Sequence, residues 1–228
     1  MMRNETDNVH VLDNIPINLQ ADEVLKRLQM RSANKRIEEM VRELIDIVGP
    51  VMRPKALYKS ARINTRNGDV LEIDGVEFTC HALRVFDKSQ MVFPYVATCG
   101  QEIDSVKFPD GGPMKAYCMT IIKNMVVNSA ANYVQDHLVK EHSLKQISSI
   151  SPGHPASWPI KQREALFPML GNVEDLIGVR LTDTYLMMPV NSVAGILYPT
   201  EVRIERCHVC PSDTCRERRT PYNPSVLE

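Results

Sequence analysis

The amino-acid sequence predicts an α+β fold. Patterns typical of amphipathic helices and of antiparallel hairpins are mixed along the 228 residues. They lack the regular strand–helix–strand alternation of a parallel sheet, and such a mixture is typical of the α+β class. The chain is 43% hydrophobic and 24% charged, which are ordinary values for a soluble globular protein. A chain of this size buries about 70% of its unfolded surface, so a core can form without disulfide bonds.

The first 50 residues predict a helical N-terminal extension. A short helix is expected over 20–30 and a longer one over 34–50. In both, apolar residues recur at helical spacing opposite a charged face. Gly49 and Pro50 end the second helix.

Strand signals and then a long helix follow. Asp74 and Gly75 stand between β-rich runs within 56–100, and an Asp-Gly pair is a strong hairpin signal. The run 91–100 predicts another strand. One long helix is expected over 111–142, and its first half is apolar nearly all round, which indicates a buried helix.

The last third of the chain predicts one helix and three strands. The helix is expected over 159–170, with Gly171 closing it. Residues 177–199 predict two strands around a turn at 189–192, and 200–207 predicts a last strand.

Charge and hydropathy exclude several classes of protein. The 27 basic and 28 acidic residues give a net charge of -1, whereas nucleic-acid binding usually shows as a strongly basic face. The N-terminus lacks the apolar segment of a signal peptide, and no run of about 18 apolar residues would span a membrane. We therefore expect a cytoplasmic protein whose six cysteines are thiols or metal ligands rather than disulfides.

A Pro-Gly turn in "SISPGHPASWPIKQREALFPML", residues 148–169, is the first candidate for a ligand site. Gly153 allows a positive φ and a close approach of the backbone to a ligand. His154 or Trp158 could cover an aromatic ring such as adenine. The alternative is a tight loop whose tryptophan packs into the core, where tryptophan is usually found.

Two segments, "SPGHPASWPIKQREALFPML" and "IGVRLTDTYLMMPVNSVAGILY", resemble the activation (reactivation) domain of cobalamin-dependent methionine synthase, and in particular its free-standing bacterial relatives. The shared order is a Pro-Gly turn, an amphipathic helix, an Ile-Gly-x-x-Leu-Thr segment and a Pro-x-x-Ser-Val-x-Gly strand. "YVATCGQEID" with the long helix that follows it is also similar to this family. The resemblance implies a twisted antiparallel sheet flanked by helices.

The resemblance also implies a task. The family binds S-adenosylmethionine and docks on a cobalamin domain, where one electron and a methyl group return inactive cobalt to methylcobalamin. The chain is therefore expected to be an accessory protein that binds a corrinoid protein or a cobalamin-dependent methyltransferase. It would support methylation or reductive reactivation of that partner without being catalytic alone. No catalytic dyad is evident in the sequence, and the positioning of two reactive centres requires none.

The resemblance assigns cofactor binding to the residues of the turn and the strand before it: Ser149, Ser151, Pro152, Gly153, His154 and Trp158. His154 stands where the family has a tyrosine. Ser149 stands where the forms that bind S-adenosylmethionine have an arginine. That arginine would pair with the carboxylate of the ligand, a charge-assisted contact that serine cannot replace. The resemblance therefore implies weak or no binding of S-adenosylmethionine.

A second motif lies in the tail. Cys207, Cys210 and Cys215 form a C-x2-C-x4-C pattern, and three soft ligands so close together suit zinc or an iron–sulfur cluster. The candidates for a fourth ligand are Cys80, Cys99, Cys118 and His208. The alternative is three thiols in a tail that happens to be rich in cysteine.

A basic cluster, Arg206 with "RERR" at 216–219, could dock an acidic protein surface or remain a solvated tail. The sequence thus divides into an extension (1–50), an activation-domain-like body (51–206) and a cysteine-rich basic tail (207–228). Two further hypotheses remain for the function. One is a metal- or iron–sulfur-bearing electron-transfer or structural module on the same fold that no longer binds S-adenosylmethionine. The other is a pure binding scaffold.

Overall fold

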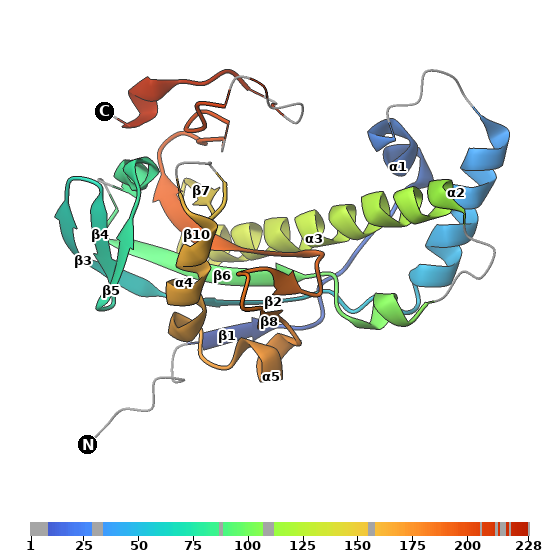
Figure 1. Cartoon of the computed structure of the whole chain (residues 1–228), viewed down its shortest axis with the longest axis horizontal. Helices are drawn as coiled ribbons and strands as arrows, with labels where there is room; N and C mark the ends of the chain where they lie inside the picture. The colour runs from blue at the N-terminus through green and yellow to red at the C-terminus, as the bar shows by residue number, and fades with distance from the viewer. Residues whose placement is uncertain are drawn as a thin grey trace.

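The α+β class predicted from the sequence is confirmed by a computed structural model, in which helices lie on both faces of an antiparallel sheet (Figure 1). The structure describes residues 9–28, 34–86, 89–106, 112–154, 158–205, 207–212, 214, 218 and 220–227. Among these residues, no helix combines the length and hydropathy needed to cross a membrane.

The main sheet has eight strands. They are β1 (Val9–Leu12), β2 (Lys55–Lys59), β3 (Ala61–Asn67), β4 (Val70–Ile73), β5 (Val76–Thr79), β6 (Met91–Thr98), β7 (Gln146–Ile150) and β10 (Ser192–Thr200). β6 lies at the centre, with β2 and β3 along one edge and β10 along the other. β1 extends the sheet beyond β2, β7 extends it beyond β10, and β4 and β5 continue from β3 as a hairpin arm. All of these pairings are antiparallel.

Short and long helices surround the sheet. They are α1 (Ala21–Arg27), α2 (Lys35–Val48), α3 (Pro113–Glu141), α4 (Arg163–Met169) and α5 (Val173–Ile177), with 3-10 turns η1 (His81–Phe86), η2 (Glu102–Ser105), η3 (Ile160–Gln162) and η4 (Pro224–Leu227). A small hairpin, β8 (Arg180–Leu181) and β9 (Met187–Met188), precedes β10. Residues 20–30 and 34–50 were predicted as helices, and α1 and α2 confirm both predictions with shorter bounds.

α3 is the longest element, and its 29 residues span roughly 43 Å at the usual helical rise. Its C-terminal half packs on one face of the sheet, where Tyr58, Phe93 and Leu138 share a core cluster. Its N-terminal half packs instead against α1 and α2. The helix is therefore buried on different sides along its length, as its nearly continuous apolar sequence predicts.

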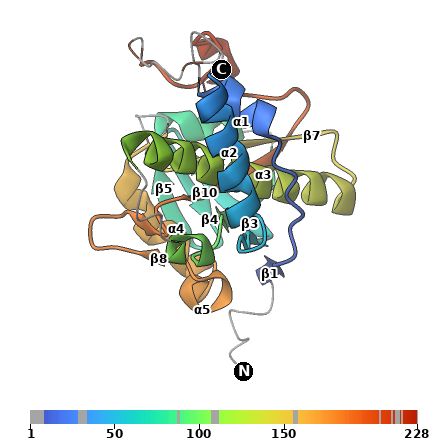
Figure 2. The same cartoon turned by 90° about the vertical axis from the view of Figure 1, so that its right-hand side faces the viewer.

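The opposite face of the sheet is covered by α4, α5 and the hairpin arm, in a cluster that includes Phe78 and Trp158. Figure 2 shows this layering, with the sheet between α4 and the C-terminal half of α3. Side chains of β6 alternate between the two clusters: Phe93 belongs to the α3 side, whereas Val92 and Val96 belong to the other. This alternation is the period of a strand buried on both faces.

Two sequence predictions differ from the structure. The N-terminal region is not helical alone, because Val9 to Leu12 pair with β2 and enlarge the sheet. The strand predicted over 200–207 is wrong, since β10 ends at Thr200. Just beyond this point the backbone N–H of Ile204 donates to the Ser148 hydroxyl at 2.8 Å. A side chain thus takes the hydrogen bond that a neighbouring strand would have received.

Candidate functional site

The Pro-Gly turn follows β7 directly and is held by its own backbone. Ser151 and His154 exchange hydrogen bonds, with N···O distances of 3.2 and 2.9 Å. Gly153 has φ +89 and donates its N–H to the Trp158 carbonyl at 2.7 Å. A residue with a side chain would be strained at this φ. The backbone conformation therefore requires glycine here, as the sequence predicted. These bonds use the backbone N–H groups of Ser151, Gly153 and His154, and Pro152 has none, so the described stretch 151–154 has no N–H group left to donate to a ligand.

Trp158 is fully buried. Its ring meets Phe78 edge-on with centroids 6.1 Å apart. Its Nε1–H donates to Gln162 Oε1 at 2.7 Å, and Gln162 also bonds both backbone groups of Thr79 on the hairpin arm, at 3.1 and 2.8 Å. The indole therefore anchors the turn to the core, and no face of it is open to cover a ligand ring in this structure.

Ser149 and Ser151 occupy the α3 side of the sheet. Ile147 belongs to the cluster under α3, and alternate residues of a strand share a face. Ser149 is partly buried opposite Leu197. Ser151 is 4% exposed, and its hydroxyl has no hydrogen-bond partner within the described part of the chain. A buried hydroxyl without a partner costs about 1–3 kcal/mol, so Ser151 is a polar group that the described structure leaves unsatisfied.

Gly195 is a residue of this site that sequence reasoning missed. A Cβ at this position would lie 2.5 Å from both the Ile150 carbonyl and the Ser151 hydroxyl. Only glycine lets β10 and the start of the turn approach so closely. The signal was present in the sequence as the glycine of the Pro-x-x-Ser-Val-x-Gly pattern.

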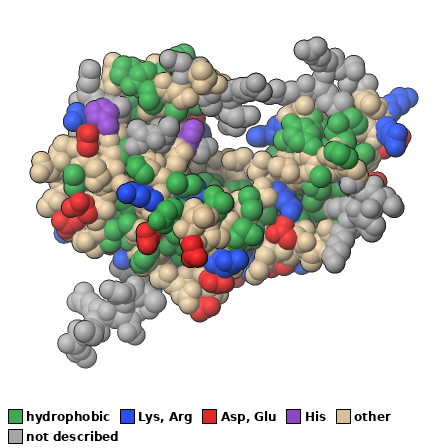
Figure 3. Space-filling view, viewed as in Figure 1, with side chains coloured by type: hydrophobic (Ala, Val, Ile, Leu, Met, Phe, Trp, Pro, Cys, Tyr) green, Lys and Arg blue, Asp and Glu red, His purple; other side chains and the backbone are tan. Residues whose placement is uncertain are grey.

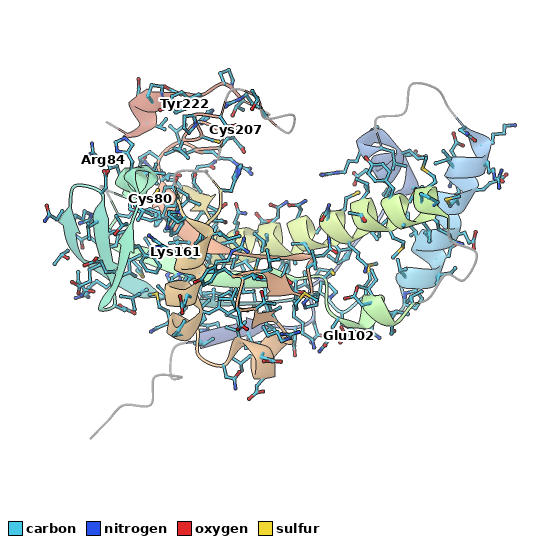
Figure 4. All side chains as sticks on the ribbon, viewed as in Figure 1. Cys80, Arg84, Glu102, Lys161, Cys207 and Tyr222 are labelled. Atoms are coloured by element: carbon cyan, nitrogen blue, oxygen red, sulfur yellow. The ribbon has the colours of Figure 1, made fainter. Side chains whose placement is uncertain are left out.

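A second missed residue is Glu102, which lies at the far end of the sheet from the tail (Figure 4). Its Oε2 is buried without a hydrogen-bond partner in the described structure, and Lys55 Nζ lies 3.7 Å from its Oε1. Gly100 has φ +84, and a Cβ there would meet this carboxylate oxygen at 2.5 Å. The glutamate belongs to "YVATCGQEID", which the resemblance included without giving it a role.

The tail is organised by an arginine. Cys207 and Cys210 lie in one turn, with Cys210 N 3.4 Å from Cys207 O. The guanidinium of Arg218 donates to the carbonyls of both cysteines, at 3.4 and 3.0 Å, and to those of Ser212 and Thr220, at 2.6 and 3.2 Å. One side chain thus binds four carbonyl groups and shapes the segment around the cysteines.

The predicted metal site finds no support in this geometry. Within the residues that the structure describes, no group of three His, Cys, Asp or Glu could hold a metal ion. Cys215, Arg206 and three residues of "RERR" lie outside the described residues, so the C-x2-C-x4-C site stays a prediction.

The candidate fourth ligands are dispersed. Cys99 and Cys118 are buried in the cluster around α1 and α2, whereas Cys80 lies in the cluster on the other face of the sheet. Burial raises the pKa of the Cys99 thiol to about 11, which keeps it protonated and unsuited to a metal. Nδ1 of His208 accepts from Glu205 N at 3.2 Å. Figure 4 places Cys80 and Arg84 beneath the segment that carries Cys207 and Tyr222.

Comparison with known proteins supports the resemblance. Residues 120–204 match the family model of the vitamin B12 dependent methionine synthase activation domain. Thirteen chains among the solved structures match. One is a crystal structure of the MetH reactivation domain bound to AdoHcy, with a TM-score of 0.59 and 14% identity over 87% of this chain and 81% of that chain. No curated protein matches the sequence.

At that identity the structural likeness establishes the fold, while the family model covers most of α3, β7, the turn and β10 in one continuous segment. Residues 120–204 thus match the model of the vitamin B12 dependent methionine synthase activation domain, and the chain shares the fold of a solved reactivation domain.

Proposed function

We propose that this chain is an accessory protein of corrinoid-dependent methyl transfer. It docks on a cobalamin-bearing protein or methyltransferase and supports methylation or reductive reactivation of its cobalt. The family match over 120–204 carries this proposal. In this proposal the protein is cytoplasmic. Residues 51–206 form the body that does the work, residues 1–50 form the N-terminal extension, and residues 207–228 form the tail.

The chemistry belongs to the cobalamin that the partner holds, which carries and transfers the methyl group. The contribution of this chain is orientation, because holding two reactive groups at the right distance and angle lowers the barrier without a catalytic dyad. The turn suits that role, since the backbone N–H groups of Ser151, Gly153 and His154 are all bonded within the chain.

The turn fits an S-adenosyl ligand only in part. The hydroxyl of Ser151 is a buried group without a partner in the described structure, and carbonyl oxygens of the turn can accept from an amine or an adenine. At the position of the family's arginine stands Ser149, which carries no positive charge for the ligand carboxylate. The relative in the comparison was crystallised with AdoHcy. For this chain we propose a site that has kept the turn and lost the carboxylate contact.

Calorimetric titration with S-adenosylmethionine tests this site. We expect weak or undetectable binding by the parent protein and at least about ten-fold tighter binding by Ser149→Arg, because a gained carboxylate–guanidinium pair is worth about 1.4 kcal/mol or more. Ser149→Met is the matched control, since it adds length without charge. Tight binding by the parent, or equal binding by all three proteins, would contradict the proposal for the site.

Partner binding is tested separately. The parent protein is mixed with a cobalamin-loaded corrinoid protein, and complex formation is measured by size-exclusion chromatography together with the absorption spectrum of the cobalt. We expect co-elution and a spectral change. The absence of both would remove the proposed function, whatever the result of the titration.

A further inference from the structure

A cavity of about 810 Å³ lies at the opposite end of β7 from the Pro-Gly turn. Its walls come from η1 and the start of β6, from the residues that lead into β7, from the end of β10 and from the C-terminal segment. Cavities that hold small molecules typically measure 300–1,000 Å³. No described residue of the turn lines it, so it is separate from the site proposed above.

The wall formed by the C-terminal segment is tied together by hydrogen bonds. Asn223 N donates to the carbonyl of His208 at 2.9 Å, which joins the two parts of the segment that face the cavity. Opposite them, the hydroxyl of Ser89 donates to the Pro199 carbonyl at 3.2 Å. The segment lies over η1, which carries Arg84 (Figure 4), and in the space-filling view a hollow separates it from α1 and α2 (Figure 3).

Much of the lining is apolar. It includes Val85, Met91, Leu144, Pro199, Ile204 and Val226. These side chains come from five separate parts of the chain, so the apolar surface is continuous only in the folded protein. Such a surface favours a ligand whose body is largely hydrocarbon.

The charged groups of the lining are mainly basic. Arg84, Lys145 and Arg203 line the cavity, and Glu201 is the one carboxylate among its described lining residues. Lys145 Nζ lies 2.6 Å from Glu201. The carboxylates that pair with Arg84 and Arg203, at 3.0 and 3.1 Å, belong to residues outside the lining. The lining residues themselves therefore carry more positive than negative charge, and an anionic ligand would compete with the paired carboxylates for these basic groups.

His208 adds a neutral donor. Its Nδ1 accepts a hydrogen bond from the backbone N–H of Glu205 at 3.2 Å. A neutral imidazole has one donor nitrogen and one acceptor nitrogen, so the proton of neutral His208 resides on Nε2. The residue lines the cavity and can donate from this nitrogen to an anion.

We propose that this cavity binds a small anionic amphiphile, such as a carboxylate on a medium-length hydrocarbon chain. The apolar wall around Met91 receives the chain, and Lys145, Arg203 and His208 receive the charge.

Three probes with the same chain test the proposal: octanoate, octanol and octylammonium, each titrated into the full protein by calorimetry. We expect octanoate to bind at least about ten-fold more tightly than octylammonium, with octanol between them. Arg203→Gln should weaken the binding of octanoate about five-fold, as expected for a partly exposed ion contact, and leave the binding of octanol unchanged. Arg42 is an exposed arginine on α2. Arg42→Gln is the matched control and should change the affinity for neither octanoate nor octanol.

A second pair of variants tests the location. Met91 and Met114 are both 42% exposed, but only Met91 lines the cavity. Met91→Trp should weaken binding of octanoate and octanol at least about ten-fold by obstructing the apolar wall, while Met114→Trp leaves the binding of both unchanged. Unfolding curves establish that each variant is folded.

The proposal is overturned if octanoate does not bind, if octylammonium binds equally well, or if folded Met91→Trp retains the parent's affinity. None of these results decides the corrinoid proposal, because its turn residues lie at the other end of β7 and partner binding is measured in a separate experiment.

Discussion

The two ends of β7 are built in different ways. At one end, the turn from Ser151 to Trp158 is closed by backbone hydrogen bonds and anchored by a fully buried indole. At the other, the C-terminal segment is shaped by polar side chains, mainly the partly buried guanidinium of Arg218. Burial of an aromatic ring contributes several kcal/mol, whereas hydrogen bonds that water can replace contribute about 1 kcal/mol each. The turn should therefore unfold only when the whole protein unfolds, whereas the C-terminal segment should unfold locally.

Trp158→Ala tests the stronger end and has the largest expected effect. Loss of the buried ring leaves a cavity beside Phe78 and should lower the free energy of unfolding by about 3–5 kcal/mol. The measurement is equilibrium unfolding in urea followed by circular dichroism. Ile160→Ala, at a neighbouring side chain that is 37% exposed, is the control and should cost less than about 1 kcal/mol. Similar losses in both variants would show that the indole is no special anchor.

Arg218→Ala tests the weaker end. Removal of the guanidinium leaves four carbonyl groups without this donor and should destabilise the C-terminal segment locally by about 2 kcal/mol. Hydrogen exchange followed by mass spectrometry should show faster exchange around His208 and Asn223, with unchanged exchange in β6. Arg218→Lys should rescue only in part, because an ammonium cannot span the same carbonyls. A loss of global stability as large as that of Trp158→Ala would contradict the contrast between the two ends.

The smallest effect concerns Glu141, at the end of the helix that leads into β7. Tyr58 OH donates to Glu141 Oε2 at 2.6 Å, and His137 Nε2 lies 3.1 Å from the same oxygen. The hydrogen bond from Tyr58, followed by the charges of His137, His142 and His10, lowers the pKa of Glu141 below its usual range. Burial, followed by the bond to Glu141, raises the pKa of Tyr58.

Because the carboxyl pKa is lower in the folded state, its stabilisation is present above the usual carboxyl pKa and is lost as pH falls through the lowered value. The side chain is 41% exposed, so the contribution should stay below about 1 kcal/mol. Urea unfolding of the parent and of Glu141→Gln at neutral and acidic pH measures it. The free energies of unfolding of the two proteins should differ at neutral pH and become equal at acidic pH. A constant difference at every pH would show that ionisation of Glu141 is not involved.

The elements that the sequence predicted well are those specified locally. The long helix was predicted from continuous apolar spacing, and the turn from Pro152, Gly153 and the flanking pattern. The clamp of Gln162 on Trp158 and Thr79 joins residues 83 positions apart, and no local pattern contains it. The pairing of β1 with β2 and the hydrogen bond from Ile204 N to the Ser148 hydroxyl, just beyond the end of β10, are likewise long-range. These contacts decide which side chains are buried, and in this structure they leave no exposed face on Trp158.

The tail shows the same limit for the candidate sites. Its cysteine spacing predicted a metal site. The sequence did not indicate a structural role for Arg218, which was noted only as part of a basic cluster. Its role depends on a convergence of carbonyl groups that appears only when the segment folds. The cavity near His208 is equally absent from any local pattern, because its lining comes from widely separated segments.

The pairing of β6 with β10 also bears on how the chain reaches its fold. Val193 lies opposite Ala97, so the centre of the sheet joins segments about 100 residues apart, and closing a loop of that length is entropically costly. Contacts so distant in sequence slow folding. During synthesis, this edge of β6 therefore stays unpaired until β10 has been made. Since exposed edges favour aggregation, the chain is expected to be prone to aggregation in this interval.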